Sequence, residues 1–171
     1  DFDLSGLGSS ASLFDIQEVN VLRGPQGFGF GPSALAGLLQ LRSADPTRQL
    51  TTHGEASLGN DGLYSAGAAL SGPFSTQNRD LQFRVSVFDS YSDGFRDDRF
   101  LSRDDTNQHD ELSSRAKLRW LATSQLTLDF NLIHYDLNNG YDAFAIDNSF
   151  DTQSDRPGVD KQTTDGAALK F

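Results

Sequence analysis

The chain has 171 residues, a net charge of −10 at neutral pH and no cysteine. The absence of cysteine excludes a disulfide framework, a cysteine-ligated zinc site and a thiol nucleophile. The acidic balance argues against nucleic acid as a partner, because the phosphate backbone attracts basic surfaces. No apolar run approaches the roughly 18 residues that a membrane-spanning helix needs.

The first quarter of the chain predicts a loop and two short strands. Residues 1–13 are small and polar, which is typical of a loop. Phe14 to Leu22 and Leu38 to Arg42 are each predicted as a strand. Five glycines lie between these strands, and Pro32 to Ala36 has the composition of one helical turn with proline at an early position.

After Pro46 the sequence alternates apolar with polar residues, which is the period of a strand with two different faces. Asn60-Asp61-Gly62 is a hairpin signal between the first two of these segments. About six successive antiparallel strands are therefore predicted, at 51–59, 63–71, 81–87, 112–120, 126–132 and 163–171.

The lengths of the connections separate two architectures that share this alternation. From 72–79 onward, short turns alternate with long acidic loops at 93–111 and 138–161. A transmembrane barrel has this arrangement, with short turns on one side and long loops on the other. Trp120 lies beside a short turn, where an interfacial aromatic residue belongs. A soluble β-sandwich can show the same alternation, so both architectures remain open on these residues.

The glycine-dense segment carries a more specific signal. FDIQEVNVLRGPQGFGFGPSALAGLLQL, residues 14–41, resembles the end of the plug domain in TonB-dependent outer-membrane receptors. LSGPF at 70–74 resembles the first periplasmic turn of that family's barrel, and SDGFRDD at 92–98 resembles the start of an extracellular loop. GYDAFAIDN at 140–148 and SDRPGVD at 154–160 resemble a later loop.

The resemblance implies an all-β fold in two parts. Residues 1–48 are expected to be the C-terminal part of a plug domain, and residues 49–171 the first strands of a larger transmembrane antiparallel β-barrel. Because the family's barrel has many more strands, we interpret the sequence as an excerpt of a longer receptor. An open sheet edge on its own would invite aggregation.

The function implied by the resemblance is active transport at the outer membrane of a Gram-negative bacterium. Such a receptor binds a scarce solute, most commonly a ferric siderophore, and imports it with energy that TonB transmits to the plug. The implied partners are TonB, the solute and outer-membrane lipid, with no nucleic acid. A passive outer-membrane porin and a soluble β-sandwich that binds a ligand are the competing hypotheses.

The resemblance also assigns roles within the plug segment. Arg23 matches an arginine that locks the plug to the barrel, and its acidic partner is expected beyond Phe171. Glycine permits positive φ and close backbone approach, while proline stiffens a joint. A structural turn is therefore expected at Gly24, Pro25, Gly27, Gly31 and Gly37.

Two further groups of residues are candidates for contact with the plug or the solute. The polar faces of the predicted strands carry four cations that are expected to face the barrel lumen: Arg84, Arg115, Lys117 and Arg119. The long loops offer aromatic and arginine side chains suited to planar, anionic or sugar-like ligands: Tyr91, Phe95, Arg96, Arg99, Tyr141 and Phe144.

No enzymatic chemistry is predicted. His53, His109 and His134 fall on separate elements without metal-ligand spacing, and DSYSDG at 89–94 has the wrong residues for a calcium loop. No serine has a histidine and an acid nearby in a known catalytic order. We therefore expect no metal, no cofactor and no catalytic residue.

Overall fold

The computed structural model describes residues 13–25, 27, 36–75, 80–142 and 144–171. Within these residues no helix has the length and apolar character required to cross a membrane. The described strands are β1 (Ile16–Arg23), β2 (Gly37–Ser43), β3 (Thr51–Leu58), β4 (Tyr64–Pro73), β5 (Leu81–Ser92), β6 (Asp97–Asp98), β7 (His109–Leu121), β8 (Thr127–Gly140), β9 (Asp151–Thr152) and β10 (Val159–Lys170).

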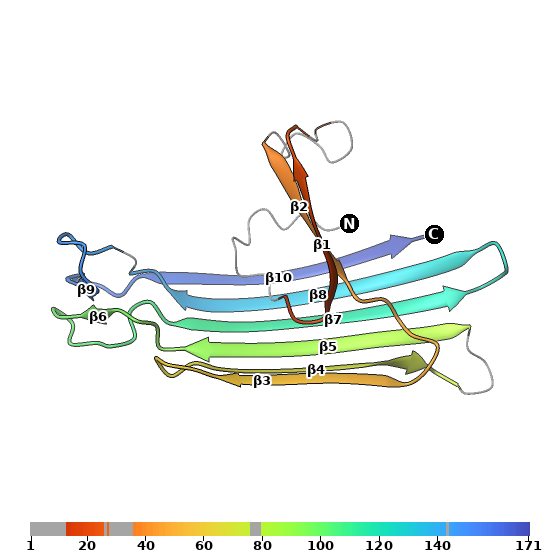
Figure 1. Ribbon diagram of the computed structural model, residues 1–171, viewed down its shortest axis with the longest axis horizontal. Helices are drawn as coiled ribbons and strands as arrows, with labels where there is room; N and C mark the ends of the chain where they lie inside the picture. The colour runs from red at the N-terminus through yellow and green to blue at the C-terminus, as the bar shows by residue number, and fades with distance from the viewer. Residues whose placement is uncertain (1–12, 26, 28–35, 76–79, 143) are drawn as a thin grey trace.

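Six of these strands form one antiparallel sheet in the order β10-β8-β7-β5-β4-β3 (Figure 1). Each long strand pairs with the next long strand along the chain, so the sheet is a meander. The turn between β3 and β4 places Asp61 and Gly62 at φ of 55° and 65°, as the hairpin signal predicts. The prediction of an all-β fold containing about six strands of an open barrel wall is confirmed.

The strands are longer than the sequence predicts. β5 ends at Ser92, beyond its predicted end at residue 87, whereas β7 begins at His109 and β8 ends at Gly140, inside segments that were expected to be loops. The Ser92–His109 and Gly140–Val159 pairs extend the backbone ladder. Polar strand ends lack the apolar alternation that marks a strand in sequence, yet backbone hydrogen bonds still hold them.

The two faces of the sheet differ in chemistry. The hairpin face is defined by the row of residues Thr51, Ser71, Arg84, Lys117, Asn131 and Ala168. The opposite face carries the neighbouring row of Thr52, Leu70, Val85, Ala116, Leu132 and Ala167. Large apolar side chains remain accessible on the opposite face, with Val85 43%, Leu132 42% and Leu169 63% exposed. An exposed apolar surface of this kind marks contact with a partner or a membrane.

Aromatic pairs mark both ends of this apolar face. Near the short turns the rings of Phe74 and Phe83 lie 5.0 Å apart, and near the long loops Tyr64 stacks on Tyr91 at 5.5 Å. Phe83 and Tyr91 are separated by roughly 26 Å along β5 at the usual rise of a strand. In a tilted strand this corresponds to roughly 20 Å of thickness, close to the ~25 Å apolar band of membrane barrels.

β1 and β2 form a separate hairpin that stands steeply on the sheet (Figure 1). At its far end Gly24 has a φ of 85°. Gly37 faces Arg23 across the ladder, and a Cβ there would lie 2.7 Å from the carbonyl oxygen of Leu22. Both positions therefore require glycine. The predicted helical turn and Gly31 fall outside the described residues.

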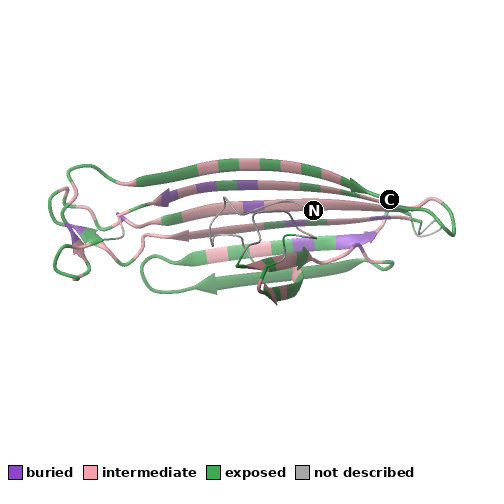
Figure 2. Cartoon of the chain, turned by 90° about the horizontal axis from the view of Figure 1, so that it is seen from above, coloured by how far each residue is buried: buried purple, intermediate pink, exposed green. Residues whose placement is uncertain are grey.

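Most buried residues lie on the central strands and at one end of the sheet, whereas β3 is exposed along its whole length (Figure 2). The buried apolar residues are few: Phe14, Ala69, Tyr135 and Leu137. Tyr135 and Leu137 pack together with Ile133 on β8, whereas Phe14, in the approach to β1, packs against Phe88 of the sheet at the base of the hairpin.

Candidate functional site

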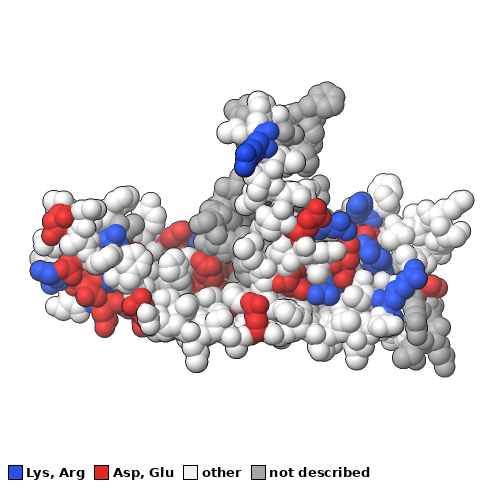
Figure 3. All heavy atoms as spheres, in the orientation of Figure 1, with Lys and Arg blue, Asp and Glu red and all other residues white. Residues whose placement is uncertain are grey.

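The hairpin contacts the sheet through the residues that flank it on both sides. Asp15 precedes β1 and Asp45 follows β2, and both carboxylates meet cations on β5 and β7. We call this arrangement the foot contact; it comprises Asp15, Asp45, Arg84, Arg115, Lys117 and Arg119. Figure 3 shows acidic and basic side chains gathered side by side at the base of the hairpin.

Arg84 and Asp15 form the most buried ion pair of the foot contact. The Nε of Arg84 donates to Asp15 Oδ2 at 2.9 Å, and its Nη2 donates to the other carboxylate oxygen. The two side chains are 13% and 5% exposed. A paired, bidentate geometry of this kind makes the interaction strong and directional.

Arg115 and Lys117 bind backbone carbonyls at the base of the hairpin, where the chain enters β1 and leaves β2. Arg115 Nη1 donates to the carbonyl of Phe14 at 2.7 Å, and Lys117 Nζ donates to the carbonyl of Ser43 at 2.7 Å. Lys117 also lies 3.4 Å from Asp45 Oδ1. The sheet therefore holds both chain segments that enter and leave the hairpin.

Arg119 connects the hairpin to the sheet's own charges. It forms a bidentate pair with Asp129 on β8, at 2.6 and 3.0 Å, and lies 3.6 Å from Asp45. Burial raises the pKa of Asp45, but the hydrogen bond from Arg42 and the charges of Lys117 and Arg119 together lower it below its usual value. Asp45 is therefore ionised at neutral pH.

The four cations predicted to face a lumen thus share the hairpin face and converge on the foot contact. That this face lines a barrel lumen stays a prediction. Sequence reasoning missed Asp15 and Asp45, the acids that they bind. Asp15 and Asp45 lie at the outer ends of the two strands predicted in the first quarter of the chain, and later predicted strands carry basic polar faces. This combination of isolated acids and basic faces was the available signal.

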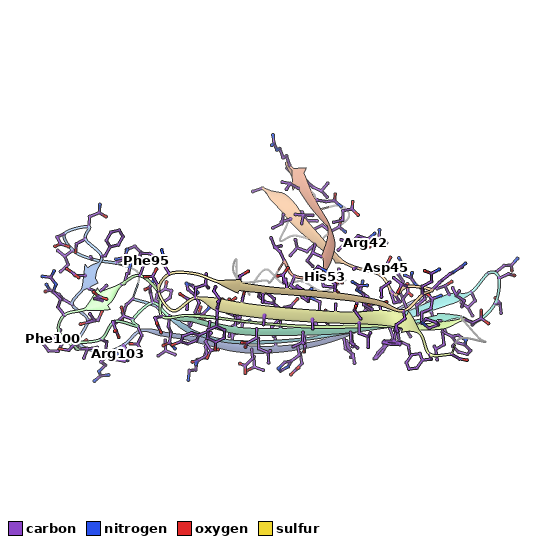
Figure 4. All side chains as sticks on the ribbon, turned by 60° about the horizontal axis from the view of Figure 1, so that its bottom comes forward. Arg42, Asp45, His53, Phe95, Phe100 and Arg103 are labelled. Carbon is purple, nitrogen blue, oxygen red and sulfur yellow. The ribbon has the colours of Figure 1, made fainter. Side chains whose placement is uncertain are left out.

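Phe14 fills a slot beside the foot contact. Its ring stacks at 5.5 Å on both His53 of β3 and Phe88 of β5. Gly67 of β4 lies beneath the ring, where the absence of a side chain makes room for it. A cavity of about 490 Å³ adjoins this slot and is also lined by Ile16, Ala44 and Glu55. In Figure 4, His53 lies below Arg42 and Asp45 at the base of the hairpin.

Substituting Gly67 with alanine is expected to displace Phe14 and weaken the hairpin's attachment. The added Cβ would stand 2.7 to 2.9 Å from three carbons of the Phe14 ring. Overpacking of this kind costs about 1–3 kcal/mol. Amide hydrogen exchange in β1 and β2 should rise in the variant. Gly54→Ala is the control, because its Cβ would meet only the carbonyl oxygen of Gly67 at 3.6 Å; equal exchange in both variants would contradict the Phe14 slot.

Arg23 lies at the far end of β1, away from the foot contact, and its side chain is exposed. Within the described part of the chain it makes no ion pair. Its assignment as a plug–barrel lock stays a prediction. Of the other predicted turn residues, Pro25 and Gly27 are exposed beyond the end of β1.

The two long loops pack on each other at one end of the sheet. We call residues 93–108 and 141–158 the loop lobe; β6 and β9 form a short parallel pair within it. Phe95 contacts Phe150 edge-on at 5.7 Å, and the Arg96 guanidinium lies 5.4 Å from the Phe95 ring. Arg96 also donates to the carbonyl of Ser149 at 3.3 Å, and Arg99 pairs with Asp151.

The loop lobe thus brings together three of the predicted solute contacts, Phe95, Arg96 and Arg99. Tyr141 and Phe144 lie on its second loop, with exposed fractions of 65% and 86%. Tyr91 lies elsewhere: it is on the opposite face of the sheet, where it stacks on Tyr64 and donates to Asp93 at 2.9 Å. In Figure 4, Phe95 and Phe100 lie at the end of the sheet remote from Asp45.

Asp98 holds the loop lobe together from inside and was not singled out in the sequence. Its carboxylate is 1% exposed. It accepts hydrogen bonds at 2.8 Å from the backbone N–H groups of Phe100, Leu101 and Ser154, and one at 3.4 Å from the Thr152 hydroxyl. Burial raises the pKa of Asp98, but these hydrogen bonds lower it more, so the net pKa lies below its usual value.

The loop lobe is therefore expected to loosen in acid. A carboxylate with a lowered pKa in the folded state contributes stability above its unfolded pKa of about 3.9, and this stability is lost as pH falls through the folded pKa. The lobe should stay closed between pH 5 and 7 and open progressively below about pH 4. Amide exchange of Leu101 and Ser154, corrected for the intrinsic pH dependence, measures this; exchange that is unchanged down to pH 2 would contradict it.

No group of three or more His, Asp or Glu side chains suited to a metal ion occurs in the described part of the chain. The described contacts are charge pairing at the foot contact and aromatic or hydrogen-bonding contact at the loop lobe.

A scan against models of known protein families finds no match. Among solved structures, the chain is similar to the crystal structure of the ferripyoverdine receptor of the outer membrane of Pseudomonas aeruginosa bound to ferripyoverdine. The TM-score is 0.74 at 17% sequence identity, and the match covers 92% of this chain. It covers 21% of the receptor, so the chain spans about a fifth of the length of that protein.

Proposed function

We propose that this chain is part of a TonB-dependent outer-membrane receptor that captures a ferric siderophore at the cell surface and imports it. Residues 1–48 would be the end of its plug and residues 49–171 the first strands of its barrel wall. The observation that carries the proposal is the foot contact: a hairpin held by charge on one face of a meander whose other face is apolar and exposed.

This arrangement favours the receptor over its two rivals. A passive porin has no need of a hairpin whose two ends are each bound by cations of the wall. A soluble β-sandwich would seal its apolar face under a second sheet, but Phe130 and Leu126 remain 39% and 41% exposed. In the described residues the six-stranded sheet has no such covering layer.

Each part has a role in the proposed transport. The loop lobe would meet the solute first, through Phe95, Arg96 and Arg99 with Tyr141 and Phe144. Because the foot contact consists of ion pairs and hydrogen bonds rather than a large apolar interface, water can replace its partners when the hairpin is pulled. TonB would apply that pull, and Arg23 would provide a second attachment of the plug.

Uptake in iron-starved cells tests the proposal. Cells that carry the full-length protein should accumulate radiolabelled iron from ferripyoverdine, or from a ferric hydroxamate or catecholate chelate, and should lose this uptake when TonB is deleted. Uptake that persists without TonB would indicate a passive pore. Recovery of the protein in the soluble fraction would contradict membrane insertion itself.

A further inference from the structure

On β7, β8 and β10 the apolar face of the sheet ends at a polar row. Ser114 on β7, His134 on β8 and Asp165 on β10 are directly opposite one another in the ladder. His134 Nδ1 lies 2.7 Å from Asp165 Oδ1, and these side chains are 40% and 77% exposed. Within the described residues the Ser114 hydroxyl makes no hydrogen bond, so it is available to a ligand.

This row lies at the edge of the apolar band on these three strands. The neighbouring row toward the short turns consists of Ala116, Leu132 and Ala167. His134 is six residues beyond Leu128, the first outward apolar residue of β8, which is roughly 15 Å of thickness for a tilted strand. The next row toward the loop lobe contains Asp89, Asp136 and Thr163. Ionisable groups that border hydrocarbon are costly unless they are paired, which is a reason to look for a bound partner.

A shallow groove of about 640 Å³ runs over the row. Its lining includes the small side chains of Ser114, Ala116 and Ala167 and the larger apolar side chains of Val85 and Leu132. The groove thus has an apolar part that continues the membrane-facing surface and a polar end at Ser114, His134 and Asp165. An acyl chain that ends in a polar linkage has the same division.

Charge decides which polar group fits. Asp89, Asp136 and Asp165 all lie on the same face of the sheet as the groove, and His134 is the basic side chain beside them. A phosphate would face net negative charge, whereas an uncharged carbonyl oxygen can accept a hydrogen bond from Ser114 without that repulsion. The groove therefore fits the ester linkage of a lipid better than its headgroup.

We propose that Ser114, His134 and Asp165 form a binding site for an ester-linked membrane lipid, with the acyl chain over Ala116, Leu132 and Ala167 and the ester carbonyl at the Ser114 hydroxyl. This inference rests on the membrane insertion proposed above. The His134–Asp165 pair positions the site by holding the imidazole beside the serine.

The site can be tested with two lipids, one with ester linkages and one with ether linkages in their place. Native mass spectrometry of the full-length protein measures binding of dipalmitoyl phosphatidylethanolamine and of its diether analogue, which lacks the carbonyl. Wild type should bind the ester lipid about threefold to tenfold more tightly, the range of one hydrogen bond. Ser114→Ala and His134→Leu/Asp165→Leu should abolish the difference.

The control is the next cross-strand pair on the same two strands. Thr163 donates to Asp136 at 3.2 Å, one row nearer the loop lobe. Asp136→Asn/Thr163→Val should keep the preference for the ester lipid. Equal binding of the two lipids by wild type, or loss of the preference in the control, would overturn the site. Binding of a second copy of the protein, in place of lipid, would also overturn the site. None of these outcomes bears on TonB-dependent uptake, so failure of the site and failure of the proposed function are distinguishable.

Discussion

Replacing Asp15 with asparagine is expected to loosen the hairpin by about 2 kcal/mol, which is the range for a hydrogen bond to a charged group. This raises the population of the detached hairpin roughly thirtyfold. The variant removes the charge that Arg84 faces at a nearly buried site. Asparagine is chosen because Asp15 has a φ of 58°, which asparagine tolerates and alanine does not. Amide exchange in β1 and β2 measures the change.

Glu18→Ala is the matched control for this experiment. Glu18 lies on the same hairpin and pairs with Arg42 at 3.8 Å, but both side chains are about half exposed. Such exposed pairs contribute less than about 1 kcal/mol. The double variant Asp15→Asn/Arg84→Leu also removes the cation that Asp15→Asn leaves without its partner charge. It should recover part of the lost stability of the hairpin's attachment. Equal exchange in Asp15→Asn and Glu18→Ala would show that the hairpin is held by something other than the foot contact.

The second large effect is expected at Asp98. Asp98→Ala leaves three backbone N–H groups without their buried acceptor, while the Thr152 hydroxyl keeps its hydrogen bond to the carbonyl of Asp97 at 3.2 Å. The two loops should separate, and amide exchange at Leu101 and Ser154 should rise roughly tenfold or more, because closed loops exchange only through opening. The adjacent Asp97 is exposed and serves as the control; Asp97→Ala should leave these amides unchanged.

Binding of solute gives the Asp98 prediction a functional measurement. If the loop lobe meets the solute as one rigid unit, Asp98→Ala should slow capture without reducing the amount of protein in the membrane. Capture at the wild-type rate, despite faster exchange at Leu101 and Ser154, would show that the lobe's rigidity is unimportant for binding.

The sheet could be predicted because it depends on local pattern. Leu81, Phe83, Val85 and Val87 alternate with polar residues, and this period alone defines a strand and its two faces. The same period put Arg84, Arg115, Lys117 and Arg119 on one face. The long acidic loops and the short turns followed from composition.

The partners of these residues could not be predicted, because they depend on contacts far apart in sequence. Arg84 meets Asp15 across 69 positions, and Arg115 meets the carbonyl of Phe14 across 101. The β6–β9 pair joins two loops whose sequences carry no strand-like alternation. Tyr91 was placed with the loop candidates by proximity in sequence, whereas the pleat of β5 directs it to the opposite face.

Spin-label accessibility along β5 tests the central claim that one face of the sheet meets lipid and the other carries the hairpin. In the full-length protein reconstituted in bilayers, single labels at successive positions from Leu81 to Phe88 are exposed to oxygen, which concentrates in lipid, and to a water-soluble nickel complex. The account predicts oxygen accessibility at Leu81, Phe83, Val85 and Val87, with little at the positions between them. Protection of these four positions from both reagents would reveal a sealed interior and would contradict the claim that this face of the sheet meets lipid.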